Sequence, residues 1–156
     1  MTEEEAYNRA AAYCAGAERC RAEIAEKARH WDIPPESVAR LLARLVAEKY
    51  IDEERYSRAY VHDKYRFAKW GKVKIAQGLR QKQIPTDTAR HALERIDDEE
   101  YIDILSGLLL AKSKSVSARS EYERHQKLIR FAIGRGFELK DIRRCIDVDE
   151  EGESAV

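Results

Sequence analysis

The chain has 156 residues, and its 29 basic and 29 acidic residues give a formal net charge of zero. It contains only seven Gly and three Pro, and runs of β-branched residues are absent, which favours helices over sheets. No apolar stretch approaches the ~20 residues of a membrane-spanning helix, and the acidic start is unlike a secretory signal peptide. We therefore expect an all-α, cytoplasmic protein with no membrane partner.

Residues 1–50 are expected to form three helices. The first covers about residues 3–17 and places small and aromatic residues on one face. The second and third flank the turn Trp31-Asp32-Ile33-Pro34-Pro35. A short turn with one buried apolar residue between two helices is typical of a helix-turn-helix arrangement.

Three more helices are expected between residues 51 and 96. Asp52 suits the N-cap of the first, because its carboxylate accepts backbone N–H bonds and acidic residues suit the positive end of a helix. This helix ends at Trp70-Gly71, a second covers about residues 72–82, and Pro85 opens a third. The apolar stripes of the second and third helices consist of Val73, Ile75, Ala76 and Leu79, and of Ala89, Ala92, Leu93 and Ile96.

The C-terminal part begins with a helix after Asp97-Asp98 that carries apolar residues through Leu109. Residues 112–120, rich in Ser, Lys and Arg, are expected to form a linker because they offer little to bury. Two further helices flank the turn Gly136-Phe137-Glu138. Residues 149–156 are expected to be an acidic, frayed tail.

Apolar residues recur across the three parts at an offset of about 50 residues. Ile75, Ile84, Ala89, Leu93 and Ile96 correspond, 51 positions earlier, to Ile24, Ile33, Val38, Leu42 and Leu45. The first four correspond, 53 positions later, to Leu128, Phe137, Ile142 and Ile146. This pattern predicts three tandem three-helix, helix-turn-helix-like repeats, 1–50, 51–96 and 97–148, in an elongated array. Ile84 and Phe137 should be buried in their turns.

Charge is distributed unevenly along the chain despite the overall neutrality. Residues 1–54 carry a net charge of −4, residues 55–95 carry +8, and residues 96–156 carry −4. Such a block of like charge indicates either a solvated helix face or an anionic partner, most plausibly nucleic-acid phosphate.

Residues with reactive side chains do not form a recognisable site. The three cysteines lack metal spacing, so we expect reduced thiols in the core. The four histidines are scattered over different helices, and a Gly-rich phosphate loop is absent. Helix N-termini explain the acidic residues near Asp52 and Asp97. We therefore expect no catalytic site, no metal site and no cofactor.

Aromatic residues alternate with cations between Arg55 and Trp70, and such a pattern is able to stack on unpaired bases. Tyr56, Tyr60 and Phe67 recur near helical spacing, which favours packing in the core for these three. The sequence leaves the role of Trp70 open.

Three motifs of the chain resemble those of one known family. Ile51-Asp52-Glu53-Glu54-Arg55-Tyr56 is similar to the start of the second repeat in the RecX family, bacterial regulators of the RecA recombinase. Gly71-Lys72-Val73-Lys74-Ile75, with Leu79, Arg80, Lys82 and Ile84, is similar to its G-x-x-(K/R)-I-x-x-x-L-(K/R)-x-K-G-I motif. Arg135-Gly136-Phe137, with Ile142, is similar to the R-G-F turn of its third repeat.

Two positions depart from the family pattern. Gln83 stands where the family usually has Gly, which removes a residue suited to a left-handed C-cap. Cys20 stands where the family often has Ser, which removes an N-cap hydroxyl. We expect neither change to prevent folding.

The resemblance implies a non-enzymatic regulator of homologous recombination, DNA repair and the SOS response. Such a protein binds RecA and its filament on single-stranded DNA, needs no cofactor, and inhibits or modulates recombinase activity; we expect a monomer. Its basic segment is expected to face phosphates or a protein partner through Arg66, Lys69, Lys72, Lys74, Arg80 and Lys82.

Two other functions are compatible with the residues. One is a stand-alone helix-turn-helix-type DNA-binding regulator without a RecA partner. However, most cations precede the expected reading helix, 86–96, which favours backbone contact over base readout. The other is a purely structural helical scaffold, which would leave the charge segregation unexplained.

Overall fold

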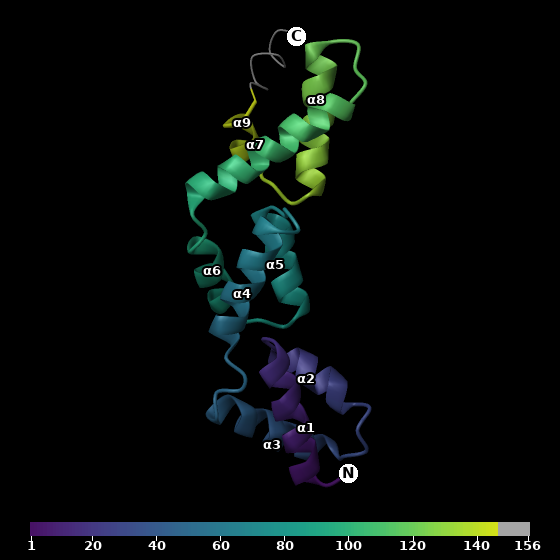
Figure 1. The fold of residues 1–156 in the computed structure, drawn as a ribbon, viewed down its shortest axis with the longest axis vertical. Helices are drawn as coiled ribbons and strands as arrows, with labels where there is room; N and C mark the ends of the chain where they lie inside the picture. Colours follow the sequence, from purple (N-terminus) through teal and green to yellow (C-terminus); the bar gives the residue numbers. More distant parts are fainter. Residues whose placement is uncertain (147–156) are drawn as a thin grey trace. The chain divides into compact units, whose positions relative to one another are not determined.

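The structure, a computed structural model, describes residues 1–146, so the tail expected at 149–156 lies outside the described residues. Within residues 1–146 all regular elements are α-helices, which confirms the predicted fold class. The helices are α1 (Glu3–Gly16), α2 (Arg21–Ala28), α3 (Pro35–Ala47), α4 (Glu53–Arg66), α5 (Lys72–Gln81), α6 (Thr86–Glu94), α7 (Asp98–Ser115), α8 (Glu121–Gly134) and α9 (Leu139–Arg143) (Figure 1). None of the helices in this range is both long and apolar enough to cross a membrane.

Helix starts follow the predicted capping chemistry. The Asp52 carboxylate oxygen Oδ1 accepts the backbone N–H of Glu54 at 3.1 Å and that of Arg55 at 3.0 Å. Asp97 caps α7 by accepting the N–H of Glu100 at 2.9 Å. The bond from the Arg55 N–H is the main reason that the pKa of Asp52 lies below its usual value.

Four helices are followed, two or three residues after their last residue, by a residue with left-handed backbone geometry. These residues are Lys49 (φ 64°), Lys69 (φ 58°), Gln83 (φ 60°) and Gly136 (φ 99°). After each of them, the next N–H reaches back to a carbonyl in the last turn of the helix: Tyr50 to Leu45, Trp70 to Lys64, Ile84 to Leu79, and Phe137 to Ala132, at 2.9–3.1 Å. Three of the four positions therefore hold a side chain where glycine is favoured.

Contacts divide the chain into two compact units, and each is described by itself. Among the described residues, the first unit contains 1–60 with 79–92, and the second contains 61–78 with 93–146. Helices α4, α5 and α6 each contribute residues to both units. The repeat boundaries expected at residues 50 and 96 stay predictions.

The core of the first unit lies among α1, α2 and α3 (Figure 1). Its buried residues are Ala6, Tyr7, Ala10, Ile24, Ala28, Trp31, Leu41, Leu45 and Ile51. Small residues on α1 allow close approach of the other helices, and Trp31 fills the turn that follows α2. Trp31 is packed in this core, since it is only 7% exposed.

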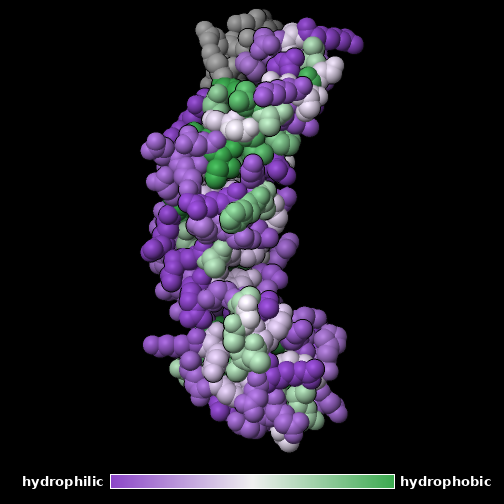
Figure 2. All heavy atoms as spheres, viewed as in Figure 1, coloured by the Kyte–Doolittle hydropathy of each residue, from purple (hydrophilic) through white to green (hydrophobic). Residues whose placement is uncertain are grey.

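The core of the second unit lies between α7, α8 and α9, joined by the end of α4 and the start of α5. Tyr101, Leu105, Leu109, Leu128, Ala132, Phe137 and Ile142 are buried there. The rings of Tyr101 and Phe137 lie 5.3 Å apart between centroids. Figure 2 shows hydrophobic side chains gathered on the visible face where Figure 1 shows α7, and Leu110 on this helix is 63% exposed.

The positions aligned by the repeat are buried or partly buried, none of them exposed. In particular, Ile84 is 6% exposed and Phe137 is 2% exposed, which confirms both as buried turn residues. Ile33 is partly buried against the core of the first unit. The offsets of 51 and 53 residues therefore identify equivalent structural positions.

Two expectations about local structure are wrong. Helix α7 continues to Ser115, so the linker is shorter than residues 112–120; the Ser115 hydroxyl donates to the Lys112 carbonyl at 3.0 Å within the last turn. Val73, expected on the buried stripe of α5, is 44% exposed. Ile75 and Leu79 form the buried side of that helix, and Val73 lies two residues before it on the opposite side.

In the first unit, the start of α2 lies against the turn between α5 and α6. The Cys20 thiol contacts the Lys82 carbonyl oxygen, with Sγ and O 3.8 Å apart. The Lys82 ammonium lies 3.3 Å from Oε2 of Glu23, and Oε1 of the same carboxylate accepts the Cys20 N–H at 3.1 Å. Burial raises the pKa of the Cys20 thiol, so the neutral form is favoured. We call these contacts the first junction.

In the second unit, the equivalent start of α5 lies against the turn between α8 and α9. The Gly71 N–H donates to the Arg135 carbonyl at 2.8 Å, and the Val73 N–H donates to the Gly136 carbonyl at 3.0 Å. A Cβ placed on Gly71 would lie 2.2 Å from the Gly136 carbonyl carbon, so a side chain does not fit. We call these contacts the second junction. It brings together the Gly71 and Gly136 motifs, which are 65 positions apart in the sequence.

Candidate nucleic-acid and partner interface

The six cations predicted to contact a partner are divided between the two units. The second unit contains Arg66 at the end of α4, Lys69 in the following turn, and Lys72 and Lys74 at the start of α5. The first unit contains the other two, Arg80 and Lys82. The candidate site is therefore built from the four cations of the second unit.

Arg66 is already paired within the second unit. Its guanidinium forms a bidentate ion pair with the Glu100 carboxylate on α7, in which Nε donates to Oε1 at 3.0 Å. The Tyr65 hydroxyl donates to the same carboxylate. These bonds, chiefly that from Arg66, hold the pKa of Glu100 below its usual value. A phosphate would have to compete with this pair, so Arg66 is better explained as a structural residue.

Lys72 and Lys74 lie over aromatic rings. The Lys72 Nζ is 4.7 Å from the ring centroid of Tyr101, and the Lys74 Nζ is 4.6 Å from that of Trp70. An aromatic face attracts a cation but carries no net charge. Both ammonium groups therefore still contribute positive potential at the surface, while their stems are held in place by the rings.

Lys69 and Arg80 are exposed. Neither has an ion pair among residues 1–146. Lys82, in contrast, is paired with Glu23. We define the lysine cluster as Lys69, Lys72 and Lys74, three cations of one unit that keep their charge available.

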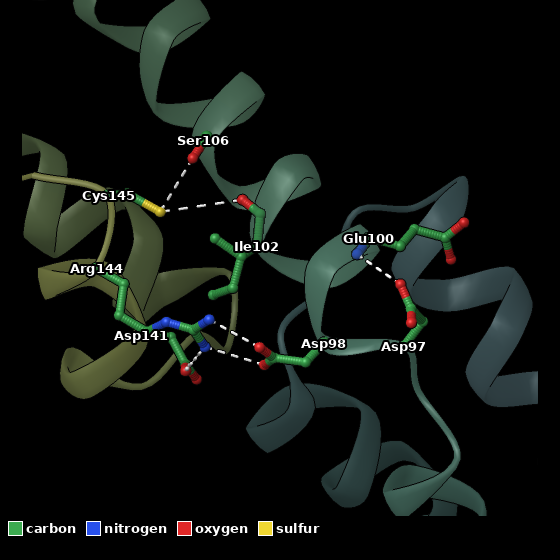
Figure 3. A network of polar contacts seen from close by, with 8 residues as sticks. All are labelled: Asp97, Asp98, Glu100, Ile102, Ser106, Asp141, Arg144 and Cys145. Atoms are coloured by element: carbon green, nitrogen blue, oxygen red, sulfur yellow. Dashed lines mark hydrogen bonds and ion pairs between the residues drawn. The ribbon is translucent and has the colours of Figure 1, made fainter.

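Acidic residues at the start of α7 hold the helices of the second unit together. Figure 3 shows Arg144, directly after α9, directed at the Asp98 carboxylate, with contacts of 2.7 and 3.0 Å. Arg144 also lies 3.7 Å from buried Asp141. The hydrogen bond from Arg144 is the main reason that the pKa of Asp98 is lowered. Capping and ion pairing therefore account for these carboxylates, as the sequence indicates.

The cysteines are free thiols, as predicted. Cys20 is buried, while Cys14 and Cys145 are half-buried. The Ser106 hydroxyl lies 3.2 Å from the Cys145 sulfur, which fixes the end of α9 against α7 (Figure 3). The contact is one between helices, not a nucleophile with a base.

Phe67, like Val73, is a residue that the sequence analysis misplaced. It was expected in the core with Tyr56 and Tyr60, but its side chain is 74% exposed. Besides Tyr56, the buried positions of α4 are Ser57, Val61 and Tyr65, which advance in steps of four, and Phe67 does not lie on that stripe. Counting the stripe from Val61 instead of from Tyr56 would have shown this.

Each third of the chain matches a model of a known protein-family domain. Residues 6–45 match the RecX first three-helix domain, residues 52–93 match the second, and residues 98–146 match the third. The matched ranges follow one another in the order that the motifs predict.

Curated relatives carry the same family name. The regulatory protein RecX of Prosthecochloris aestuarii is 30% identical over 143 residues, which cover 91% of each chain. That of Chlorobaculum tepidum is 28% identical over 141 residues, covering 90% of this chain and 86% of the relative. That of Bacillus cytotoxicus is 24% identical, and the match spans only 53% of that longer relative.

Solved structures have the same fold. A crystal structure of regulatory protein RecX has a TM-score of 0.85 at 26% identity, over 92% of this chain and 72% of the other. RecX from Lactobacillus salivarius also has a TM-score of 0.85, at 23% identity, over 95% of this chain and 97% of the other. With three consecutive domain matches and a relative at 30% identity, the chain belongs to the RecX family of regulatory proteins.

Proposed function

We propose that this chain binds a RecA recombinase and its filament on single-stranded DNA, and thereby inhibits or modulates recombinase activity without catalysing a reaction itself. The observation that carries this proposal is the match of all three RecX domain models, in order, along residues 6–146. The relatives' printed name, regulatory protein, supports a regulatory role. We propose that it acts in the cytoplasm, where its recombinase partner works.

The lysine cluster supports an anionic partner for the second unit. Residues 64–74 contain five cations and no carboxylate. Of these cations, Arg66 is occupied by Glu100, whereas the charges of Lys69, Lys72 and Lys74 remain available. Sequence-independent contact with phosphates needs point charges of this kind and no base-specific side chains.

The stand-alone DNA-reading function has weaker support. A helix-turn-helix reader places its second helix in the major groove, and that helix here is α6. One of its few cations, Arg90, lies 3.2 Å from Asp87 on the same helix. The available positive charge therefore lies ahead of α6, as it does in the sequence.

Capture and inhibition experiments test the proposal. The purified chain should co-precipitate with RecA, both free and assembled on single-stranded DNA, and should slow RecA-driven strand exchange in proportion to its concentration. Absence of capture and inhibition in both states, with a folded protein, would reject the proposed function.

Charge reversal of the lysine cluster tests the surface. The triple variant Lys69→Glu, Lys72→Glu and Lys74→Glu should bind single-stranded DNA more weakly, with a log–log salt slope reduced by roughly 0.7 per lost phosphate contact. It should also inhibit strand exchange less. The matched control reverses three lysines outside the cluster, Lys49, Lys114 and Lys140, for the same change in net charge. Unaltered binding and inhibition in a folded cluster variant would exclude this surface.

A further inference from the structure

An exposed aromatic ring lies inside the basic segment of the second unit. Phe67 directly follows α4 and is 74% exposed, the largest exposed fraction among the large hydrophobic residues described. A single exposed hydrophobic residue needs no explanation by itself. The segment that contains Phe67 does call for an explanation, because it combines a second aromatic ring, several cations and a fixed backbone.

The second ring, that of Trp70, has two ammonium groups near it. Lys64 Nζ lies 4.7 Å from the Trp70 ring centroid, and Lys74 Nζ lies 4.6 Å from it. Two cations drawn to one indole keep both ammonium groups at Trp70, which follows Phe67 by three residues. The sequence left the role of Trp70 open, and the structure assigns it the position of a cation-holding ring.

The backbone of this segment is fixed at both ends. The Phe67 N–H donates to the Asp63 carbonyl at 2.9 Å, and the Trp70 N–H donates to the Lys64 carbonyl at 3.0 Å. Gly71, the next residue, belongs to the second junction and donates to Arg135 at 2.8 Å. The ring of Phe67 is therefore presented on a pre-organised turn, which lowers the entropy lost when a ligand binds.

Lys69 occupies a backbone position that disfavours it. Its φ of 58° lies in the left-handed region, where glycine is preferred, and the side chain is exposed. Lys49 has nearly the same geometry, with φ 64°. Lys49 is followed within five residues by Asp52, Glu53 and Glu54, whereas residues 64–74, which include Lys69, contain five cations and no carboxylate. The two lysines thus form a natural matched pair with opposite electrostatic surroundings.

We propose that Phe67 stacks on an unpaired base of single-stranded nucleic acid while Lys69, Lys74 and Lys64 contact the adjoining phosphates. This inference rests on the proposed function and names a contact for it. A nucleotide offers both a π-face and a negative charge, so it matches an aromatic ring surrounded by cations. An acidic protein surface would use the cations but would gain little from a flat exposed ring without a pocket.

Removing the bases separates stacking from charge. We would measure the affinity of the isolated protein for a labelled oligo(dT) and for an abasic oligonucleotide of the same length, by fluorescence anisotropy. Phe67→Ala should weaken oligo(dT) binding about tenfold, within the roughly 5- to 150-fold range for one stacked base, and should leave abasic binding unchanged. Phe67→Trp should retain the base-dependent part, and Phe67→Leu should lose it.

Leu110→Ala is the control for loss of an exposed apolar side chain, since Leu110 on α7 is 63% exposed. It should leave both affinities unchanged. Equal weakening of both oligonucleotides by Phe67→Ala, or no weakening of either, would overturn stacking. Retained oligonucleotide binding with loss of RecA capture would also overturn it, and would identify a protein-binding surface instead.

The lysine pair tests the phosphate contact without disturbing the fold. Lys69→Gly and Lys49→Gly relieve the same backbone strain, so both should raise the melting temperature or leave it unchanged. Only Lys69→Gly should weaken oligonucleotide binding and reduce the salt slope, by roughly 0.7. Equal effects of the two variants on binding would overturn the assignment of Lys69.

These measurements are independent of the recombinase. If wild-type protein inhibits RecA but Phe67→Ala binds oligo(dT) normally, the stacking inference fails and the proposed function stands. If base-dependent binding is lost in Phe67→Ala while wild-type protein neither captures nor inhibits RecA, the stacking inference stands and the proposed function fails.

Discussion

The two junctions occupy equivalent positions in the repeat but use different chemistry. Position 20 corresponds to position 71, and position 83 corresponds to position 136, by the offsets that align the apolar residues. In the first junction a buried thiol and a Lys–Glu pair connect α2 to the α5–α6 turn. In the second, two glycines allow the backbones to approach, and the N–H groups of Gly71 and Val73 donate directly to carbonyls of the α8–α9 turn.

This difference teaches which positions tolerate change. Where side chains make a junction, one side chain can be replaced by another of similar size at a moderate cost in stability. A junction made by backbone contact has no room for a Cβ, as the 2.2 Å distance at Gly71 shows. The cations of the candidate interface follow Gly71 directly, so the stricter junction is the one that positions them.

The largest expected effect is at the buried turn residues. Phe137→Ala should lower the free energy of unfolding by about 3–5 kcal/mol, because it removes a buried ring that packs on Tyr101. Ile84→Ala, at the corresponding position of the first junction, should lower the free energy of unfolding by an amount near the lower end of about 2–5 kcal/mol. Urea denaturation measures both. A loss below about 1 kcal/mol for Phe137→Ala would mean that the repeat alignment is wrong.

The next largest effect, the loss of stability on substituting Gly71 or Cys20, distinguishes the two junctions most clearly. Gly71→Ala should cost about 3 kcal/mol, since its new methyl group meets the Gly136 backbone, which cannot move aside like a side chain. Cys20→Ala at the equivalent position should cost only about 1 kcal/mol. The control is Gly107→Ala on α7, where nothing lies within 4 Å; it should gain up to about 1 kcal/mol. Similar losses for Gly71→Ala and Cys20→Ala would contradict the comparison.

A smaller difference is expected from two tyrosines at equivalent places, the fourth residues of α4 and α7. The Tyr101 hydroxyl accepts the Lys72 N–H at 2.9 Å, so Tyr101→Phe should leave that amide unpaired and cost about 1–2 kcal/mol. Tyr56 faces the Cys20 thiol, a weak partner, so Tyr56→Phe should cost less than about 1 kcal/mol. Thermal unfolding of the two variants side by side checks this; a reversed order would show that the thiol contact is the stronger.

The smallest effect is a gain. Gln83→Gly should raise the free energy of unfolding by about 0.5–1 kcal/mol, because Gln83 has φ 60° where Gly136 occupies the counterpart position with φ 99°. Gln77→Gly, in the exposed interior of α5, should instead lose about 0.5–1 kcal/mol. A loss at both positions would show that the Gln83 side chain stabilises the first junction by more than its backbone strain costs.

Much of the fold follows from local patterns. Asp52 and Asp97 mark helix starts, because a short carboxylate next to an apolar stripe satisfies backbone donors that are otherwise unpaired. The recurrence of Ile24, Ile75 and Leu128 identifies the repeat, since equivalent helices bury equivalent positions. The same patterns carry the family resemblance that the domain models confirm.

The sequence did not show which side chains of the candidate interface are available to a binding partner. Arg66 and Lys69 look alike in a charge count, but Glu100, 34 positions later, pairs with Arg66 and leaves Lys69 exposed. Phe67 fits a helical spacing with Tyr60, yet α4 ends at Arg66 and its buried stripe passes through Tyr65. A periodicity cannot show where a stripe ends or which distant carboxylate reaches a cation.

The sequence by itself determined the helices, the repeat, the block of positive charge and the family. The tertiary structure alone decided that Gly71 meets Gly136, that the middle repeat is shared between two compact units, and that Phe67 faces solvent among lysines. The physical reason is one of range. Capping, helical periodicity and charge are properties of neighbouring residues, whereas steric fit and ion pairing depend on residues that only folding brings together.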